Sequence, residues 1–152
     1  MNNVYVICGF SGVGKSTAEQ KSKNVVDFES SVYSHFFDDN HLMGEKNPNF
    51  PRNYIDALCE SIDKGRENVY LISCHEEVRK ELTKRGIDYI IVMPSADQKN
   101  DYLKRWLTRG SSVEFITMMD KRWGEMHRSC ESDNSPKIYL DSYEYISDVL
   151  PL

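Results

Sequence analysis

Gly9-Phe10-Ser11-Gly12-Val13-Gly14-Lys15-Ser16-Thr17 decides the fold, because it matches the phosphate-binding pattern G-x-x-x-x-G-K-[ST]. The apolar run 4–8 before it predicts a buried strand, and the glycine-free run 15–23 after it predicts the start of a helix. Together these elements form an anion site, because backbone N–H groups and the helix dipole point to the same place. The alternative is a chance glycine-rich turn, and the strand–helix context argues against it.

The motif assigns roles to individual loop residues. We expect Lys15 to reach the β- and γ-phosphates of a nucleotide, and the hydroxyl of Ser16 to bind Mg²⁺. The residues expected to hold the phosphates are Ser11, Gly12, Val13, Gly14, Lys15, Ser16 and Thr17.

Composition indicates one globular domain over 1–152, with 39% hydrophobic residues for a core. The net charge of −5 disfavours binding of nucleic acid over a broad surface, although a local basic pocket stays compatible with it. No apolar run approaches the roughly 18 residues of a membrane span, and no secretion signal opens the chain. We therefore expect a soluble cytoplasmic protein with no membrane partner.

The four cysteines, Cys8, Cys59, Cys74 and Cys130, show no spacing typical of a metal site. We expect them to be buried free thiols, which suits a reducing cytoplasm.

Short β-rich runs alternate with helical patterns, which is typical of a parallel α/β sheet. The expected strands are 3–8, 24–28, 68–73, 88–93 and 137–140. A capping-box pattern, Ser73-x-x-Glu76, predicts a helix that starts at Ser73 and ends before Gly86. Right-handed crossovers place all five strands in one sheet with helices on both faces, so ligands are expected at the carboxyl ends of the strands.

An acidic pair, Asp27 and Glu29, stands at the end of the second expected strand. Alternating strand geometry places both carboxylates on one side, near the phosphate loop. We expect Asp27 to support the metal, directly or through water, or to act on the acceptor, and Glu29 to contact the acceptor. A solvated strand end is the alternative for both.

Arg105 and Arg109 lie four residues apart on an expected helix and share a face, while Trp106 and Leu107 are expected to be buried. Because Gly110 follows, the two arginines are candidates to close over phosphates. Phosphoryl transfer needs charge neutralisation above all, which arginine supplies. A solvated helix face is the alternative.

Arg52 follows a turn at the start of another expected helix, where the phosphate of a second substrate would be stabilised. Four aromatic residues flank it and are candidates for stacking on a base or, alternatively, for the core: Tyr33, Phe36, Phe37 and Phe50. At the end of the third strand, Ser73-Cys74-His75 offers no carboxylate for Mg²⁺.

These segments resemble the adenylate-kinase-like nucleotide and nucleoside kinases, and shikimate- and gluconate-type kinases share the plan. More narrowly, 9–17, 26–31, 47–54 and 114–116 look like small nucleotide-kinase-like proteins of bacteriophages. The resemblance spans nearly the whole chain, but among its motifs only the phosphate loop is highly specific.

The resemblance implies a three-layer P-loop kinase fold with sheet order 2-3-1-4-5 and ATP with Mg²⁺ as donor. It implies a short arginine-bearing lid over about 105–113 and an acceptor-binding region over about 29–54. By this resemblance, Arg105 and Arg109 match the pair of lid arginines. Asp27 and Glu29 match the acidic pair, and Arg52 matches the arginine that binds the acceptor phosphate. The strand-three aspartate of adenylate-type kinases is missing, and the lid lacks a zinc-binding insert.

The leading hypothesis is a P-loop kinase that transfers the γ-phosphoryl group of ATP to a (deoxy)nucleoside monophosphate, with Lys15, Asp27, Arg105 and Arg109 as catalytic residues. One alternative is a kinase acting on a 5′-end or a modified base of nucleic acid, which the net charge disfavours. Another is an ATP-binding regulatory protein without kinase activity, which the missing strand-three carboxylate favours. The sequence leaves the oligomeric state open, a homodimer included.

Overall fold

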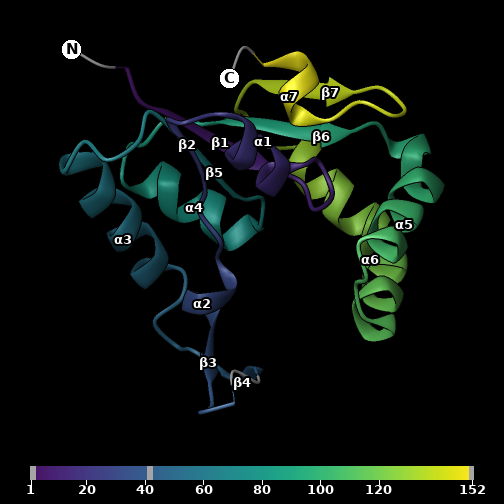
Figure 1. Cartoon of the computed structure of the whole chain (residues 1–152), viewed down its shortest axis with the longest axis horizontal. Helices are drawn as coiled ribbons and strands as arrows, with labels where there is room; N and C mark the ends of the chain where they lie inside the picture. Colours follow the sequence, from purple (N-terminus) through teal and green to yellow (C-terminus); the bar gives the residue numbers. More distant parts are fainter. Residues whose placement is uncertain (1–2, 41–42, 151–152) are drawn as a thin grey trace.

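The computed structural model describes residues 3–40 and 43–150, which form a five-stranded parallel sheet flanked by helices (Figure 1). The parallel α/β sheet that the sequence predicts is confirmed. Its strands lie in the order β2-β5-β1-β6-β7. Their bounds are β1 (Tyr5–Gly9), β2 (Val25–Asp27), β5 (Val69–Ser73), β6 (Ile90–Pro94) and β7 (Lys137–Leu140).

The three central strands are continuous apolar runs, as strands covered on both faces require. Ile7 and Cys8 of β1 are buried between β5 and β6. The register pairs Gly9 with Ser73 on one side and with Val92 on the other. The phosphate loop therefore leaves β1 at the level where β5 ends.

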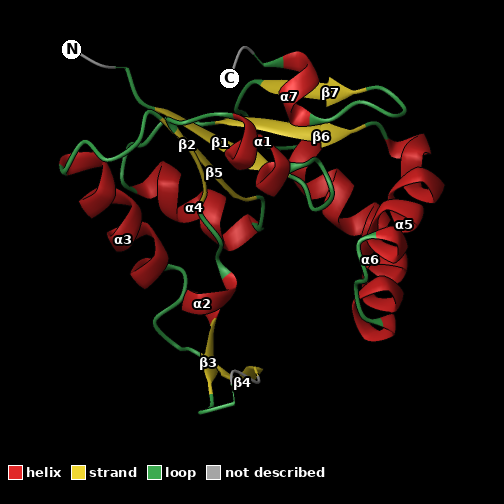
Figure 2. Cartoon of the chain, viewed as in Figure 1, coloured by secondary structure: helices red, strands yellow, loops and turns green. Residues whose placement is uncertain are grey.

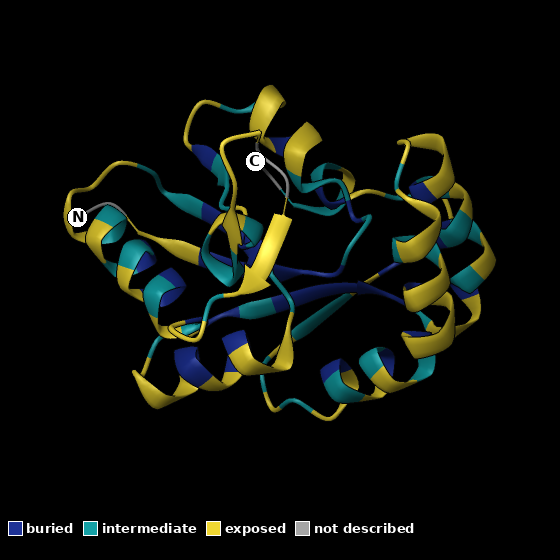
Figure 3. Cartoon of the chain, turned by 90° about the horizontal axis from the view of Figure 1, so that it is seen from below, coloured by how far each residue is buried: buried dark blue, intermediate teal, exposed yellow. Residues whose placement is uncertain are grey.

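Helices lie on both sides of the sheet (Figures 1 and 3). Within these layers α1 packs against α7, and α3 packs against α4. Their bounds are α1 (Lys15–Lys21), α2 (Ser31–Ser34), α3 (Arg52–Asp63), α4 (Glu76–Lys84), the 3-10 helix η1 (Ala96–Gln98), α5 (Lys99–Thr108), α6 (Val113–Glu131) and α7 (Ile146–Val149). In the described part of the chain, no helix has the length and apolar character needed to cross a membrane.

A two-stranded antiparallel ribbon, β3 (His35–Phe37) with β4 (Met43–Lys46), projects from the end of α2 (Figure 2). The sequence did not predict it, because its strands are short and every residue of β4 is exposed, so no apolar alternation marks them. Phe36 is 52% exposed, whereas Tyr33 and Phe50 pack into the core.

Two local predictions are wrong. Ser73 does not start a helix, because its pairing with Gly9 keeps it in β5, and His75 is the residue that precedes α4. Leu107 is 69% exposed, although its neighbour Trp106 is fully buried. Adjacent helical positions point about 100° apart, so only the Tyr102–Trp106 face of α5 reaches the core.

Candidate functional site

The loop between β1 and α1 turns at two glycines with positive φ, 94° at Gly12 and 95° at Gly14. Glycine adopts this conformation without the steric cost that a side chain brings. Between them Val13 is buried, and its N–H donates to the carbonyl oxygen of Phe10 (3.2 Å). The Val13 carbonyl accepts from the N–H of Ile146 (2.8 Å), so the loop is fixed at its centre.

A cavity of about 980 Å³ opens at the carboxyl ends of β1, β2 and β5. It brings together most of the residues that the sequence predicts for the site: Ser11, Gly12, Gly14, Lys15, Ser16, Thr17, Asp27, Glu29, Arg105 and Arg109. Although both are described, Val13 and Arg52 do not line it.

Lys15 is the first residue of α1, and its Nζ donates to the carbonyl oxygen of Gly9 (3.0 Å). This contact folds the side chain back over the loop. Burial lowers the pKa of Lys15, although Asp27 opposes the shift. A partly desolvated ammonium in a cavity lined by a helix N-terminus is suited to an anionic ligand.

Two buried oxygen atoms in this cavity lack a hydrogen-bond partner among the described residues: Oδ1 of Asp27 and Oγ of Ser73. They end the neighbouring strands β2 and β5. Burial raises the pKa of Asp27, and the charge of Lys15 opposes the shift. Because buried polar atoms are nearly always satisfied, this pair indicates a place for a ligand, a cation or water.

The two residues expected to contact an acceptor lie apart. Glu29 is exposed at the cavity, and its Oε1 accepts from the N–H of Ser31 (3.1 Å) at the start of α2. Arg52 is exposed at the first turn of α3, where its carbonyl oxygen accepts from Nη2 of Arg85 (3.4 Å). Only Glu29 belongs to the cavity wall.

Arg105 is a structural brace for the phosphate loop. Its side chain is 7% exposed, its Nη1 donates to the carbonyl oxygen of Gly12 (3.0 Å), and its Nη2 donates to that of Glu144 (2.8 Å). The guanidinium carbon lies 4.4 Å from the ring centroid of Tyr102 and 4.1 Å from that of Tyr145. Arg105 therefore ties α5, the loop and the segment before α7 together.

Arg109 has a different environment, although it is one helical turn away. It is exposed, with Nη2 donating to Oγ of Ser11 (3.2 Å) and Nε to Oγ of Ser111 (2.9 Å). Burial lowers the pKa of Arg109, and the charge of Glu29 in the same cavity wall opposes the shift. The hydrogen bond to Ser11 places the guanidinium beside an anion held at the loop.

Polar and aromatic residues of the cavity wall to which sequence reasoning gave no role include His75, Lys104, Arg122, Tyr143 and Tyr145. Tyr143 and Tyr145 follow β7, and the rule that ligands bind at the carboxyl ends of parallel strands would have pointed to them. His75 lies just beyond the end of β5, where the same rule applies. Lys104 and Arg122 carried no distinguishing signal in the sequence.

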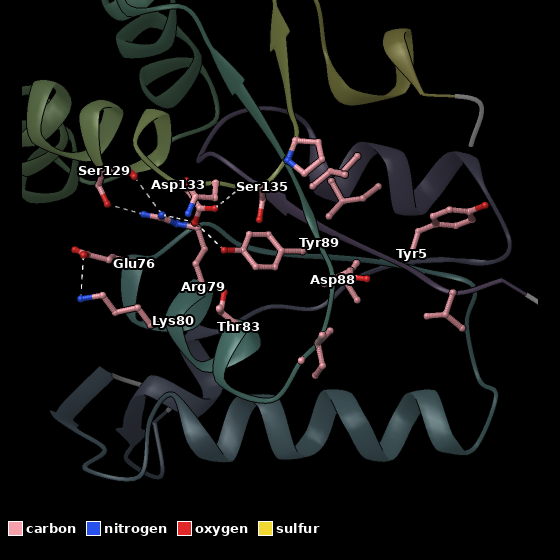
Figure 4. Close-up of a pocket in the computed structure, with 18 of the residues that line it drawn as sticks. Tyr5, Glu76, Arg79, Lys80, Thr83, Asp88, Tyr89, Ser129, Asp133 and Ser135 are labelled. Atoms are coloured by element: carbon pink, nitrogen blue, oxygen red, sulfur yellow. Dashed lines mark hydrogen bonds and ion pairs between the residues drawn. The ribbon is translucent and has the colours of Figure 1, made fainter.

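A larger cavity, of about 1520 Å³, shares Glu76, Arg79 and Ser129 with the first and extends from them to the amino ends of the central strands (Figure 4 labels these three residues). It is lined by the first residues of three strands, Tyr5, Val69 and Ile90. Ligand sites of parallel sheets lie at the carboxyl ends, where the loop, Lys15 and Asp27 converge. The smaller cavity is therefore the candidate site.

No protein-family model matches the chain, and a search of curated proteins finds no matching sequence. The assignment of a function therefore depends on the chemistry of the cavity.

The first prediction concerns Gly14, where an added Cβ would lie 2.9 Å from Cδ1 of Tyr145 at a φ of 95°. We expect Gly14→Ala to lower the free energy of unfolding by about 2–3 kcal/mol, because backbone strain and overpacking add. The control is Gly65→Ala, at a φ of 65° with no heavy atom within 4 Å, for which we expect a loss of about 1 kcal/mol. Urea denaturation followed by circular dichroism measures both, and equal losses would contradict the packing argument.

The second prediction separates the two arginines. Arg105→Ala removes the hydrogen bonds to Gly12 and Glu144 and an ion pair with Asp101 (3.2 Å). We expect it to lower the free energy of unfolding by about 3 kcal/mol, since it leaves buried groups unpaired. Arg109→Ala should stay within about 0.5 kcal/mol of the parent protein, because Arg109 is exposed. Thermal or urea unfolding measures the stability of both variants. A larger loss of unfolding free energy for Arg109→Ala than for Arg105→Ala would overturn the assignment of Arg105 as the brace.

Proposed function

We propose that this chain is an ATP- and Mg²⁺-dependent phosphotransferase with a P-loop kinase fold, acting on a (deoxy)nucleoside monophosphate. One observation carries the proposal: a single cavity contains the phosphate-loop lysine, the guanidinium of Arg109, and a carboxylate oxygen of Asp27 that has no hydrogen-bond partner among the described residues. A site that only holds a polyphosphate needs the phosphate-loop lysine. A site that transfers a phosphoryl group also needs a group for the acceptor and a cation for the developing charge.

The charged residues of the cavity have different roles toward the phosphates. Lys15 and the N-terminus of α1 hold the β- and γ-phosphates, and Arg109 neutralises the transferred group from α5. Arg105 acts through the loop, because its hydrogen bonds are to backbone carbonyl groups. Asp27 supports the metal ion or orients the acceptor phosphate.

The residues present fit Mg²⁺. Oδ1 of Asp27 and Oγ of Ser73 are buried oxygens without a partner among the described residues, and Ser16, an exposed residue, lines the same cavity. Within 3–40 and 43–150, no cluster of three or more His, Cys, Asp or Glu side chains offers a complete metal cage. Mg²⁺ commonly takes one or two protein ligands together with phosphate oxygens and water, and it would supply charge neutralisation between the phosphates.

The direct test incubates the purified chain with ATP and Mg²⁺ and a panel of ribo- and deoxyribonucleoside monophosphates, and separates the products by anion-exchange chromatography. We expect one or a few monophosphates to become diphosphates as ADP accumulates. Oligonucleotides with a free 5′-hydroxyl are added as substrates and as competitors. Transfer only to oligonucleotides would identify a nucleic-acid kinase, and ATP binding without any transfer would identify a regulatory ATP-binding protein.

The third prediction is that Lys15→Ala lowers phosphotransfer at least about 100-fold, because it removes a positioned charge from the transferred group. The matched control is Lys21→Ala, which removes an exposed lysine from the other end of α1 and should leave activity unchanged. Circular dichroism establishes that both variants fold. Undiminished turnover in Lys15→Ala would contradict the proposed role of the loop.

The fourth prediction uses the raised pKa of Asp27. The folded protein binds this proton more tightly than the unfolded chain does, so stability falls as the pH rises from about 3.8 through the raised pKa. Asparagine cannot ionise, so we expect Asp27→Asn to be more stable than the parent protein at pH 7 and equally stable below about pH 3.8. The same variant should lose most of its phosphotransfer activity.

Urea unfolding at pH 3.5 and pH 7, combined with the product assay, tests this prediction. Glu29→Gln is the control for stability, because Glu29 is exposed and its neutralisation should not change the free energy of unfolding. Lower stability of Asp27→Asn at pH 7 would mean that the carboxylate is well compensated in the folded state.

A further inference from the structure

Two thiols meet at the cavity of the candidate site. Cys74 follows β5 directly, and Cys130 lies in the last turn of α6, 56 residues further along the chain. Their Sγ atoms are 3.3 Å apart. A disulfide bond joins sulfur atoms about 2.05 Å apart, so closure requires the two atoms to approach by about 1 Å.

The pair reaches the cavity mainly through Cys74. Both residues belong to the cavity wall, and Cys74 keeps partial exposure while Cys130 is 2% exposed. The other two cysteines differ: Cys8 is fully buried in β1, and Cys59 lies on α3 away from the cavity wall.

Arg79 of α4 holds the two cysteine-bearing segments together. Its Nε donates to the carbonyl oxygen of Cys74 (3.0 Å), and its Nη2 donates to Oγ of Ser129 (2.6 Å), the neighbour of Cys130. An ion pair with Asp133 (2.9 Å) fixes the guanidinium further (Figure 4). Arg79 is 4% exposed, so these contacts lie in the interior and link the segments that carry the two thiols.

The same surroundings make one thiol the more acidic. The hydrogen bond from Cys74 lowers the pKa of the Cys130 thiol, and the charge of Arg79 adds to this while burial opposes it. That hydrogen bond and burial raise the pKa of Cys74. Thiolates are the reactive form, so Cys130 is the natural nucleophile of the pair.

We propose that Cys74 and Cys130 are a site of reversible oxidation, at which a peroxide forms an intramolecular disulfide across the wall of the cavity. The Cys130 thiolate attacks one peroxide oxygen, the O–O bond breaks, and a sulfenic acid and hydroxide result. The sulfur of Cys74 then attacks the sulfenic sulfur, the S–O bond breaks and an S–S bond forms. Two thiols lose two electrons and two protons, and hydrogen peroxide is reduced to two water molecules.

The bond would join the end of β5, where Ser73 lies, to α6, which supplies Met119 and Arg122 to the cavity wall. Oxidation would therefore restrain the distance between two sides of the candidate site. A dithiol reductant restores the original thiols by exchange.

The test treats the full chain with hydrogen peroxide at neutral pH, alkylates the remaining thiols and maps the peptides by mass spectrometry. We expect a linked peptide pair containing Cys74 and Cys130, lighter by two hydrogen atoms and lost after dithiothreitol. Cys8 and Cys59 should stay reduced during the peroxide treatment and therefore be found alkylated. This mapping needs no nucleotide and no enzymatic activity, so its result tests the disulfide proposal independently of the proposed phosphotransferase function.

Cysteine variants show which thiols form the bond. Cys59→Ser should form the linked pair as the parent chain does, whereas Cys74→Ser and Cys130→Ser should each form none. Non-reducing electrophoresis shows whether the bond lies within one molecule, and the mapping of the parent chain decides the case even if a cavity variant does not fold. Full alkylation of Cys74 and Cys130 after peroxide, a pairing with Cys8, or linkage only between molecules would each overturn the proposal.

Discussion

The hydrogen bond from Arg105 to the carbonyl oxygen of Gly12 joins residues 93 positions apart, and the geometry of the site depends on it. The N–H of Ile146 makes the equivalent contact to Val13. Together these two hydrogen bonds satisfy carbonyl groups of the loop. The elements on either side of the loop, a five-residue strand and a seven-residue helix, would not hold it in place by themselves. The loop is therefore ordered before a ligand arrives, which reduces the entropy that binding would otherwise lose.

The buried oxygens of Asp27 and Ser73 differ from these braced carbonyl groups, because they have no hydrogen-bond partner within the described part of the chain. A desolvated carboxylate lowers the stability of the fold, and such positions are typical of sites that bind or react. The proposed phosphotransferase uses the braced loop to hold the phosphates and the two unpartnered oxygens to receive the metal and the acceptor.

Much of the fold could be predicted, because the runs around Ile7 and Ile91 are apolar enough to require burial on both faces. The errors arise where one pattern fits two structures. Ser73 followed by Glu76 has the form of a capping box, yet the ladder with β1 holds Ser73 as a strand residue. Leu107 matches the apolar stripe of a helix but lies outside the face that packs. The β3–β4 ribbon has no core-facing side and hence no periodic signal.

The sequence by itself determined the parallel sheet, the glycine-rich loop after its first strand and the charged side chains at the carboxyl ends of the strands, because these follow from local patterns of burial, glycine and charge. Only the tertiary structure decided that Arg105 braces the loop while Arg109 stays exposed beside it, and that Cys74 meets Cys130. These outcomes depend on contacts between segments far apart in the chain. Residue type and spacing describe a helix face or a strand end, but they do not say which distant segment packs against it.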